Sequence, residues 1–255
     1  MPRSIFSRSI EPLVTVLWSI FLLWSLWLAA VWIVPVGTEE LGFVVGSPPP
    51  PNADLRRAIL LLAENADLVW LALAVMNLHL TLTLTHGLRV TRTWLALCAG
   101  GGFALGMLNV KTGALFGKAQ FGAALGMKLL GVALGWVLLW AVLVLGAREA
   151  VLWLRPRASH RTATVLTAAV VLLTAFNLEW PARELRGWWL RQQDATGTLG
   201  APLQNWLTWA VCSGLMAFAM REKDVRSGAA PRSGRPVILL AALNAIALVA
   251  RLRHG

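Results

Sequence analysis

The sequence is short of charged residues, cysteine and tyrosine. Only 14% of its 255 residues are charged, whereas soluble domains carry about a quarter. Its two cysteines, Cys98 and Cys212, both lie inside apolar runs, which gives neither a disulfide framework nor the spacing of a metal site. Tyrosine is absent. The low charge argues against an ordinary soluble protein, and the cysteines argue against a disulfide scaffold.

What the sequence does contain is apolar. Hydrophobic residues make up 57% of the chain, the mean hydropathy is +0.65, and the apolar residues come in long runs, as in integral membrane proteins. Several of the 14 tryptophans lie near the ends of these runs, where an indole ring suits the headgroup boundary. We expect an all-α integral membrane protein with one membrane domain over residues 1–255.

Seven apolar segments are each close to the ~20 residues that cross a bilayer. They lie at residues 13–35, 66–86, 92–109, 126–147, 161–180, 203–220 and 236–252. The first is too long for a signal-peptide core and has no clear cleavage site, so we expect it to be retained. The pattern therefore predicts about seven transmembrane helices.

The net charge of +11 would suggest nucleic acid in a soluble protein. Here the arginines and lysines lie in the connections between apolar runs, so a lipid bilayer with anionic headgroups is the simpler partner and no nucleic acid is expected. Positive residues are modestly more numerous at the N-terminus and in the second, fourth and sixth connections. This bias predicts a multi-pass protein of the cell membrane with a cytoplasmic N-terminus.

Ionisable groups at membrane depth are costly, so each one is a candidate functional residue. Glu64 and Asp67 begin the second span three residues apart, and we expect them to share a helix face. Two carboxyls so close could supply an acid and a base. They could equally form a solvated helix start, where negative charge suits the N-terminal dipole.

Three other ionisable residues lie within or at the ends of spans. Glu179 closes the fifth span and is either a buried acid or the partner of Arg183, one turn later. His79 and His86 are seven residues apart, a spacing that suits hydrogen bonds between helices better than a metal site. We expect no metal at these histidines.

The most ordered stretch of the sequence is glycine-rich and contains three lysines but no acid. It reads KTGALFGKAQFGAALGMKLLGVALGW and spans residues 111–136. The spacings of Gly113 to Gly117 and of Gly122 to Gly126 let backbone approach another backbone or a ligand closely. Irregular backbone at membrane depth must be covered by protein. We expect an interfacial or re-entrant segment, with its lysines reaching the headgroups.

This stretch resembles the central motif of a family of membrane carotenoid biosynthesis proteins, which includes bisanhydrobacterioruberin hydratases and γ-carotene hydratases. The resemblance covers residues 100–215. It runs through VKTGALFG, FGAALGMKLLGV, Trp140, LEWPARELRGWW and APLQNWLTW, and the order and spacing of these pieces agree with the family.

The resemblance implies a hydro-lyase type of enzyme that adds water to a terminal isoprenoid double bond of a carotenoid. An acid protonates the alkene, and water captures the resulting tertiary carbocation, with no cofactor. On this resemblance we expect Glu179 to be the proton donor and Asn205 and Gln204 to orient the water or the new hydroxyl. Asp67 and Glu64 are substitute acids.

The resemblance also implies a set of residues that line the substrate. They are Thr112, Gly113, Phe116, Gly117, Phe121, Trp140 and Trp206. The partners it implies are the carotenoid substrate and other carotenoid biosynthesis enzymes.

Several positions depart from the family pattern, which usually has polar or tyrosine side chains there. They are Gly106, Ala119, Phe121, Leu139 and Ala175. These departures motivate an alternative, a non-catalytic relative that binds carotenoids or organises their enzymes. A small-solute transporter ranks last, because the sequence has no evident repeat and no paired broken spans.

Overall fold

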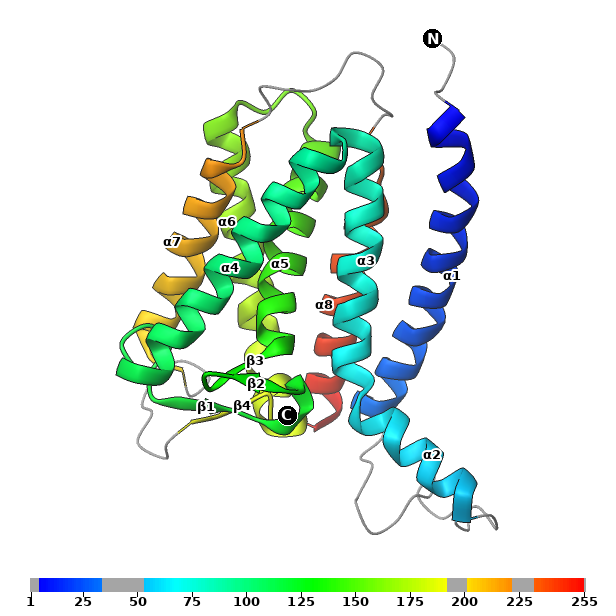
Figure 1. The fold of residues 1–255 in the computed structure, drawn as a ribbon. Coiled ribbons are helices and arrows are strands. Elements are labelled where there is room, and N and C mark those ends of the chain that lie inside the picture. Colours follow the sequence, from blue (N-terminus) through cyan, green and yellow to red (C-terminus); the bar gives the residue numbers. More distant parts are fainter. Residues whose placement is uncertain (1–4, 34–52, 192–200, 222–231, 255) are drawn as a thin grey trace.

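The computed structural model describes residues 5–33, 53–191, 201–221 and 232–254. Within these ranges the chain is a bundle of long helices with short strands across one end (Figure 1). The helices are α1 Ile5–Ile33, α2 Ala53–Glu64, α3 Ala66–His86, α4 Leu88–Thr112, α5 Leu134–Leu154, α6 His160–Trp180, α7 Leu203–Ala219 and α8 Arg235–His254.

Each of the seven expected spans corresponds to a helix. Six of these helices are long and apolar enough to cross a membrane. The remaining helix, α7, corresponds to the expected span at residues 203–220. It has 17 residues and runs alongside α6 (Figure 1). The prediction of an all-α integral membrane protein is confirmed.

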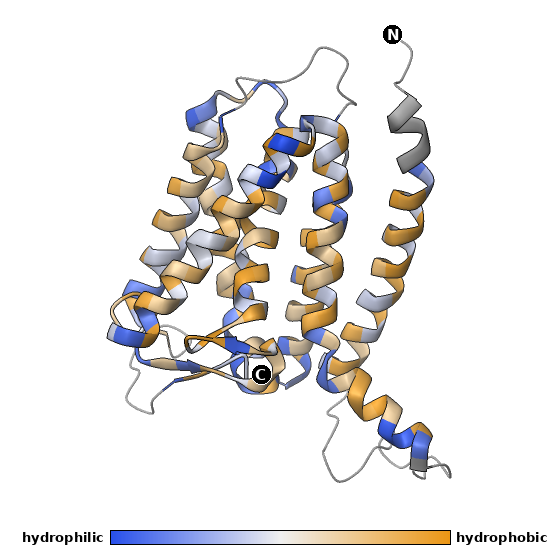
Figure 2. Ribbon diagram, in the orientation of Figure 1, coloured by the Kyte–Doolittle hydropathy of each residue, from blue (hydrophilic) through white to orange (hydrophobic). Residues whose placement is uncertain are grey.

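Helix α5 is the centre of the bundle. Every residue from Leu139 to Leu152 is buried, and α5 packs against α3, α4, α6, α7 and α8. A helix that is apolar all round lies either in a protein core or against lipid, and the five neighbours of α5 place it in the core. The outer helices instead present apolar outer faces, orange in Figure 2, while hydrophilic residues gather toward the ends of the bundle. That distribution suits a bilayer around the middle of the bundle.

The fourth expected span begins later than predicted, at Leu134 and not at residue 126. The intervening residues form a hairpin in which β2 (Lys128–Leu129) pairs with β3 (Val132–Ala133). Leu130 and Gly131 turn this hairpin with φ values of 51° and 84°, which no α-helix accommodates. Apolar content alone could not reveal this, because the hairpin is itself rich in apolar residues.

The glycine-rich segment lies across one end of the bundle (Figure 1), as expected of an interfacial segment. Its strand β1 (Ala119–Phe121) pairs antiparallel with β4 (Trp189–Arg191), with Ala119 opposite Arg191. Gly122 follows β1 and donates its N–H to the carbonyl of Trp188, 2.9 Å away. This strand pair fastens the loop after α4 to the segment after α6. We call this end of the molecule the strand end.

Candidate functional site

Glu179, the penultimate residue of α6, is a buried carboxylate with three hydrogen-bond donors. Its Oε1 accepts hydrogen bonds from Arg191 Nε at 3.0 Å, Arg191 Nη2 at 2.7 Å and Trp189 Nε1 at 3.1 Å. The Arg191 guanidinium also donates to the carbonyl of Phe116. Glu179 is only 1% exposed. The site thus joins α6, β4 and the loop after α4.

Of the two alternatives for Glu179, the structure shows the buried acid, and the pairing with Arg183 is wrong. Arg183 Nη2 lies 2.8 Å from Glu184 Oε1 instead. The α-helix ends at Trp180, and residues Pro181–Leu185 form a π-helical turn. The spacing of one α-helical turn therefore no longer brings residue 183 beside residue 179.

Asp67 is a second buried carboxylate at the strand end. Its Oδ1 accepts a hydrogen bond from Trp32 Nε1 at 2.7 Å, and its Oδ2 accepts one from Arg186 Nε at 2.7 Å. Arg186 also donates to the carbonyl of Ala63 at 3.0 Å. This cluster ties α1 and α3 to the segment after α6. A buried charge is tolerated when it is paired and hydrogen-bonded in this way.

Glu64 does not share a helix face with Asp67, so that prediction is wrong. Glu64 is exposed and is the last residue of α2. Helix α3 starts afresh at Ala66, so the two carboxyls belong to different helices. The i,i+3 rule holds only within one continuous helix.

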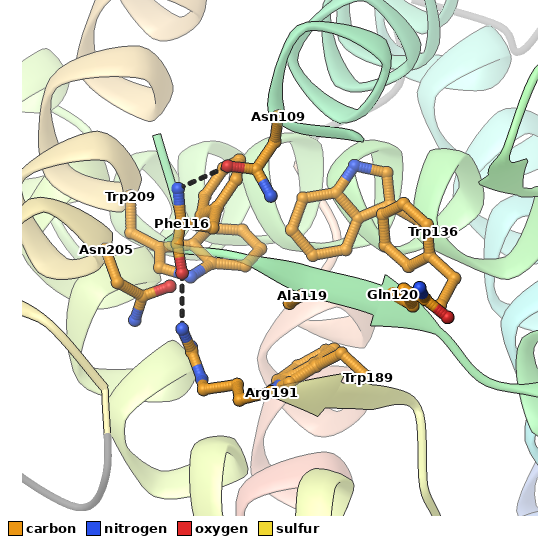
Figure 3. A pocket seen from close by; sticks show the side chains of 10 residues that line it. Asn109, Phe116, Ala119, Gln120, Trp136, Trp189, Arg191, Asn205 and Trp209 are labelled. Carbon is orange, nitrogen blue, oxygen red and sulfur yellow. Dashed lines mark hydrogen bonds between the residues drawn. The ribbon is translucent and has the colours of Figure 1, made fainter. Parts of the chain in front are cut away.

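A small cavity of about 20 Å³ lies next to Arg191. Ten residues line it, and Figure 3 draws them as sticks. They are Asn109, Phe116, Ala119, Gln120, Phe121, Trp136, Trp189, Arg191, Asn205 and Trp209. A space of this size holds about one water molecule. A carotenoid end group would therefore have to displace the lining side chains in order to enter.

The two asparagines of the cavity differ in their hydrogen bonds. Asn109 Oδ1 accepts from the N–H groups of Leu115 and Phe116 at 3.2 and 2.8 Å, and its Nδ2 donates to the Gly117 carbonyl at 3.0 Å. Asn205 is 2% exposed, and its Nδ2 has no hydrogen-bond partner within the described residues. Buried amides are rarely unpaired, so Asn205 offers a free donor to a water or ligand.

Five of the ten residues that line the cavity are aromatic. The Trp136 ring lies 5.0 Å from that of Phe116 and 5.2 Å from that of Phe121, measured between centroids. Behind it, Trp140 stacks on Trp209 at 4.5 Å. Ring faces of this kind attract positive charge. The cavity therefore combines a cation-stabilising wall with polar amide and guanidinium groups.

Small residues on α4 make room for these indoles. A Cβ at Gly102 would lie 2.6 Å from Trp140 Cβ, and one at Gly106 would lie 2.9 Å from Trp136 Nε1. Trp136 Nε1 also donates to the Gly102 carbonyl at 3.0 Å. The indole of Trp136 thus lies against Gly106, where a side chain would otherwise project.

Beside the cavity lies an open basin of about 490 Å³. Its lining shares Asn109, Ala119, Gln120 and Arg191 with the cavity. The other lining residues are Val110, Lys111, Thr112, Gly113, Lys118 and Leu190. Four shared residues thus form the partition between the two spaces.

The expected substrate-lining residues fall into several groups. Phe116 and Phe121 line the cavity, whereas Thr112 and Gly113 line the basin. Gly117 is buried in the loop between them, and Trp140 is fully buried behind the cavity. Trp206 lies outside both linings and packs against Phe176 at 5.2 Å.

Of the expected water-orienting residues, only Asn205 lines the cavity. Gln204 is exposed and donates to the Gly113 carbonyl at 3.3 Å. Sequence reasoning missed Arg191, the partner of Glu179. An available signal was its position two residues after Trp189, which on a strand places both side chains on one face.

Comparison with known proteins assigns the chain to a family. A family model described as "Carotenoid biosynthesis protein" matches residues 65–253. This range runs from the start of α3 almost to the end of α8 and contains every residue of the cavity lining. No curated protein and no solved structure matches the chain. Since the match covers most of its length, the chain belongs to the carotenoid biosynthesis protein family.

Proposed function

We propose that the protein adds water across a terminal isoprenoid double bond of a carotenoid. The observation that carries this proposal is the cavity, which has room for one water molecule between aromatic faces and the amide of Asn205. Membership of the family supports a carotenoid as the substrate class. The geometry supports a reaction in which water meets a carbocation.

In this reaction the π electrons of the alkene take a proton from a carboxylic acid, leaving a tertiary carbocation. The oxygen of the bound water then forms the new C–O bond, and the carboxylate takes back a proton. One water is consumed, and the acid is regenerated. The rings of Phe116, Trp136 and Trp189 stabilise the cation, while Asn205 holds the water.

Glu179 is our candidate for the acid. No aspartate or glutamate is among the cavity-lining residues, but Glu179 hydrogen-bonds to two of them, Trp189 and Arg191. Its Oε1 already accepts three hydrogen bonds, so the ion pair with Arg191 must rearrange and the carboxylate must take up a proton from water before Glu179 can donate one. Entry of an end group would supply that rearrangement, because the cavity has to open to admit it.

A second candidate function is non-catalytic binding or organisation of carotenoids and of the enzymes that act on them. One observation favours it: both buried carboxylates of the strand end, Glu179 and Asp67, are engaged by arginines. On this alternative the ion pairs hold an apolar site in shape and no proton is transferred. Carotenoid should then co-purify with the protein unchanged.

Expression in a host that accumulates lycopene or γ-carotene, followed by mass analysis of extracted pigment, separates the two candidates. Hydration predicts a product heavier by one water that is absent with empty vector. Glu179→Gln, which keeps a hydrogen-bond acceptor, should lower product at least about a hundredfold. Glu184→Gln, on the same segment but half-exposed, is the matched control.

Each outcome of that experiment is decisive for one candidate. Full activity of Glu179→Gln in membranes would remove Glu179 from the mechanism. Unchanged pigment across several acyclic and monocyclic carotenoids, with pigment bound to the purified protein, would favour the binding role. Colourless protein that carries only lipid would count against binding.

We also infer that the chain is a multi-pass protein of the cell membrane with its N-terminus in the cytoplasm. The support is the modest excess of arginine and lysine in the N-terminal segment and alternate connections. In this orientation the strand end faces away from the cytoplasm, since α1 runs toward it from the N-terminus (Figure 1). Labelling of a cysteine at Lys128→Cys by a membrane-impermeant reagent in intact cells would test it, and protection there would reverse the assignment.

A further inference from the structure

We propose that the basin binds the phosphate group of an amphiphile, a role separate from hydration at the cavity. The basin is open and about 490 Å³ in volume, large enough for a phosphorylated headgroup. Its cationic lining residues are Lys111, Lys118 and Arg191, and no aspartate or glutamate lines it. The charge of the site therefore selects an anion.

The two lysines supply the uncompensated positive charge. Arg191 is neutralised by Glu179, 2.7 Å away. Lys111 and Lys118 are exposed, and neither forms an ion pair with any described residue. An ammonium group binds phosphate as a point charge. Gln120, also exposed on the basin wall, adds an amide donor.

The loop that carries the lysines is held in shape by buried hydrogen bonds. The side chain of Asn109 binds three backbone groups of residues 115–117, and Thr208 of α7 donates to the Leu115 carbonyl at 2.9 Å. Gly113, with φ of 67°, turns the chain at the end of α4. A Cβ there would lie 2.8 Å from Lys118 Cγ, so Lys118 folds back over the turn and reaches the same hollow as Lys111.

Apolar surface beside the lysines indicates that the phosphate is attached to an apolar chain. Val110 and Leu190 line the basin and are 40% and 58% exposed. An anion bound by the lysines would place its chain along these side chains toward the apolar outer face of the bundle (Figure 2). Two sources have this chemistry: the headgroup of an anionic phospholipid and a prenyl diphosphate.

The test is binding to the purified full chain in neutral detergent, measured by native mass spectrometry after exchange of endogenous lipid. The probes are phosphatidylglycerol, phosphatidylcholine and farnesyl diphosphate, with inorganic pyrophosphate as competitor. The double variant Lys111→Gln/Lys118→Gln should weaken binding of the anionic probe more than tenfold, because each lysine near a headgroup contributes about fivefold. Lys128→Gln is the control, since Lys128 is exposed at the strand end but outside the basin lining.

The outcomes identify the source or reject the site. Loss of phosphatidylglycerol binding in the double variant alone supports a phospholipid site. Loss of farnesyl diphosphate binding, with displacement by pyrophosphate, supports a prenyl diphosphate site. Equal binding by wild type and double variant, or an equal loss with Lys128→Gln, would overturn the proposal. Pigment is not measured, so failure here is distinct from failure of the hydration proposal.

Discussion

The two ends of the bundle both bury a carboxylate against an arginine, and the cavity described above lies at the strand end. There, Glu179 meets Arg191 beside the space for one water. At the opposite end, which we call the helix end, Glu149 of α5 meets Arg148 at 3.0 Å. Neither the cavity nor the basin has a lining residue from this second cluster.

The side chains of the cluster at the helix end contact one another closely. Glu149 Oε1 also lies 3.1 Å from His86 Nε2, a contact between α5 and α3. Arg148 donates to the Met220 carbonyl at 2.9 Å and lies 4.4 Å from the centroid of the Trp94 ring. The group therefore joins α3, α4 and α5 to the end of α7. This arrangement fits a structural role.

The two ends differ in the backbone structure of the segments that carry the charged residues. At the helix end Glu149, Arg148 and His86 lie on regular helices, and a second arginine, Arg232, approaches Glu149 Oε2 to 3.7 Å from the segment before α8. At the strand end Arg191 comes from a short strand and Phe116 from a loop. Irregular backbone leaves polar groups and space that regular helices would fill, and functional residues gather on such segments.

The largest expected effect is on stability at the helix end. Glu149→Ala leaves Arg148 buried without its carboxylate, which should lower the free energy of unfolding by about 3–5 kcal/mol. Thermal unfolding in detergent measures this change. Product per folded protein should be unchanged. Glu184→Ala removes a partly exposed pair with Arg183, worth at most about 1 kcal/mol; equal losses in both variants would contradict the assignment.

The next largest effect is at the strand pair. A Cβ at Gly122 would lie 1.6 Å from the Gly187 carbonyl oxygen, so Gly122→Ala must displace β4 and with it Arg191. We expect a loss of about 1–3 kcal/mol together with loss of product. Gly100→Ala on α4 meets no heavy atom within 4 Å and should be neutral or stabilising. A Gly122→Ala protein with normal product would show that the strand pair does not position the site.

The sequence predicted the helices well because membrane spans depend mainly on local apolar content. It failed where the backbone departs from a regular helix. The start of α5 was missed because the apolar hairpin of β2 and β3 has the composition of a span. The π-helical turn after Trp180 changed the partner of Glu179, and a break at Asn65 separated Glu64 from Asp67.

For the candidate site, the resemblance named Phe116, Phe121 and Asn205, and all three line the cavity. Arg191 could not be paired with Glu179 from sequence alone, because their contact depends on β4 returning across the end of α6 beside β1. Asn109 was equally hidden, since its role is to bind the backbone of its own loop. The contacts of Arg191 and Asn109 depend on where the loops lie in the folded structure, which helical periodicity does not predict.

A smaller effect should separate two adjacent amides at the strand end. Asn205→Leu removes the free donor from the cavity wall and should reduce hydrated product about tenfold, in line with the loss of one or more hydrogen bonds to water. Gln204→Leu changes an exposed side chain and should leave product nearly unchanged. The ratio of hydrated to unchanged pigment measures both. Equal losses would mean that neither amide acts through the cavity.

The smallest effect concerns the exposed acid beside the strand end. Glu64→Gln alters a side chain on α2 that is exposed and separated from Asp67 by a break between helices. Surface substitutions of this kind usually change stability by no more than about 0.5 kcal/mol, and product should also be unchanged. Melting temperature and pigment ratio check the two expectations together. Loss of product with normal stability would identify Glu64 as the proton donor. The proton would then come from an exposed carboxyl group and not from Glu179, the buried partner of Arg191.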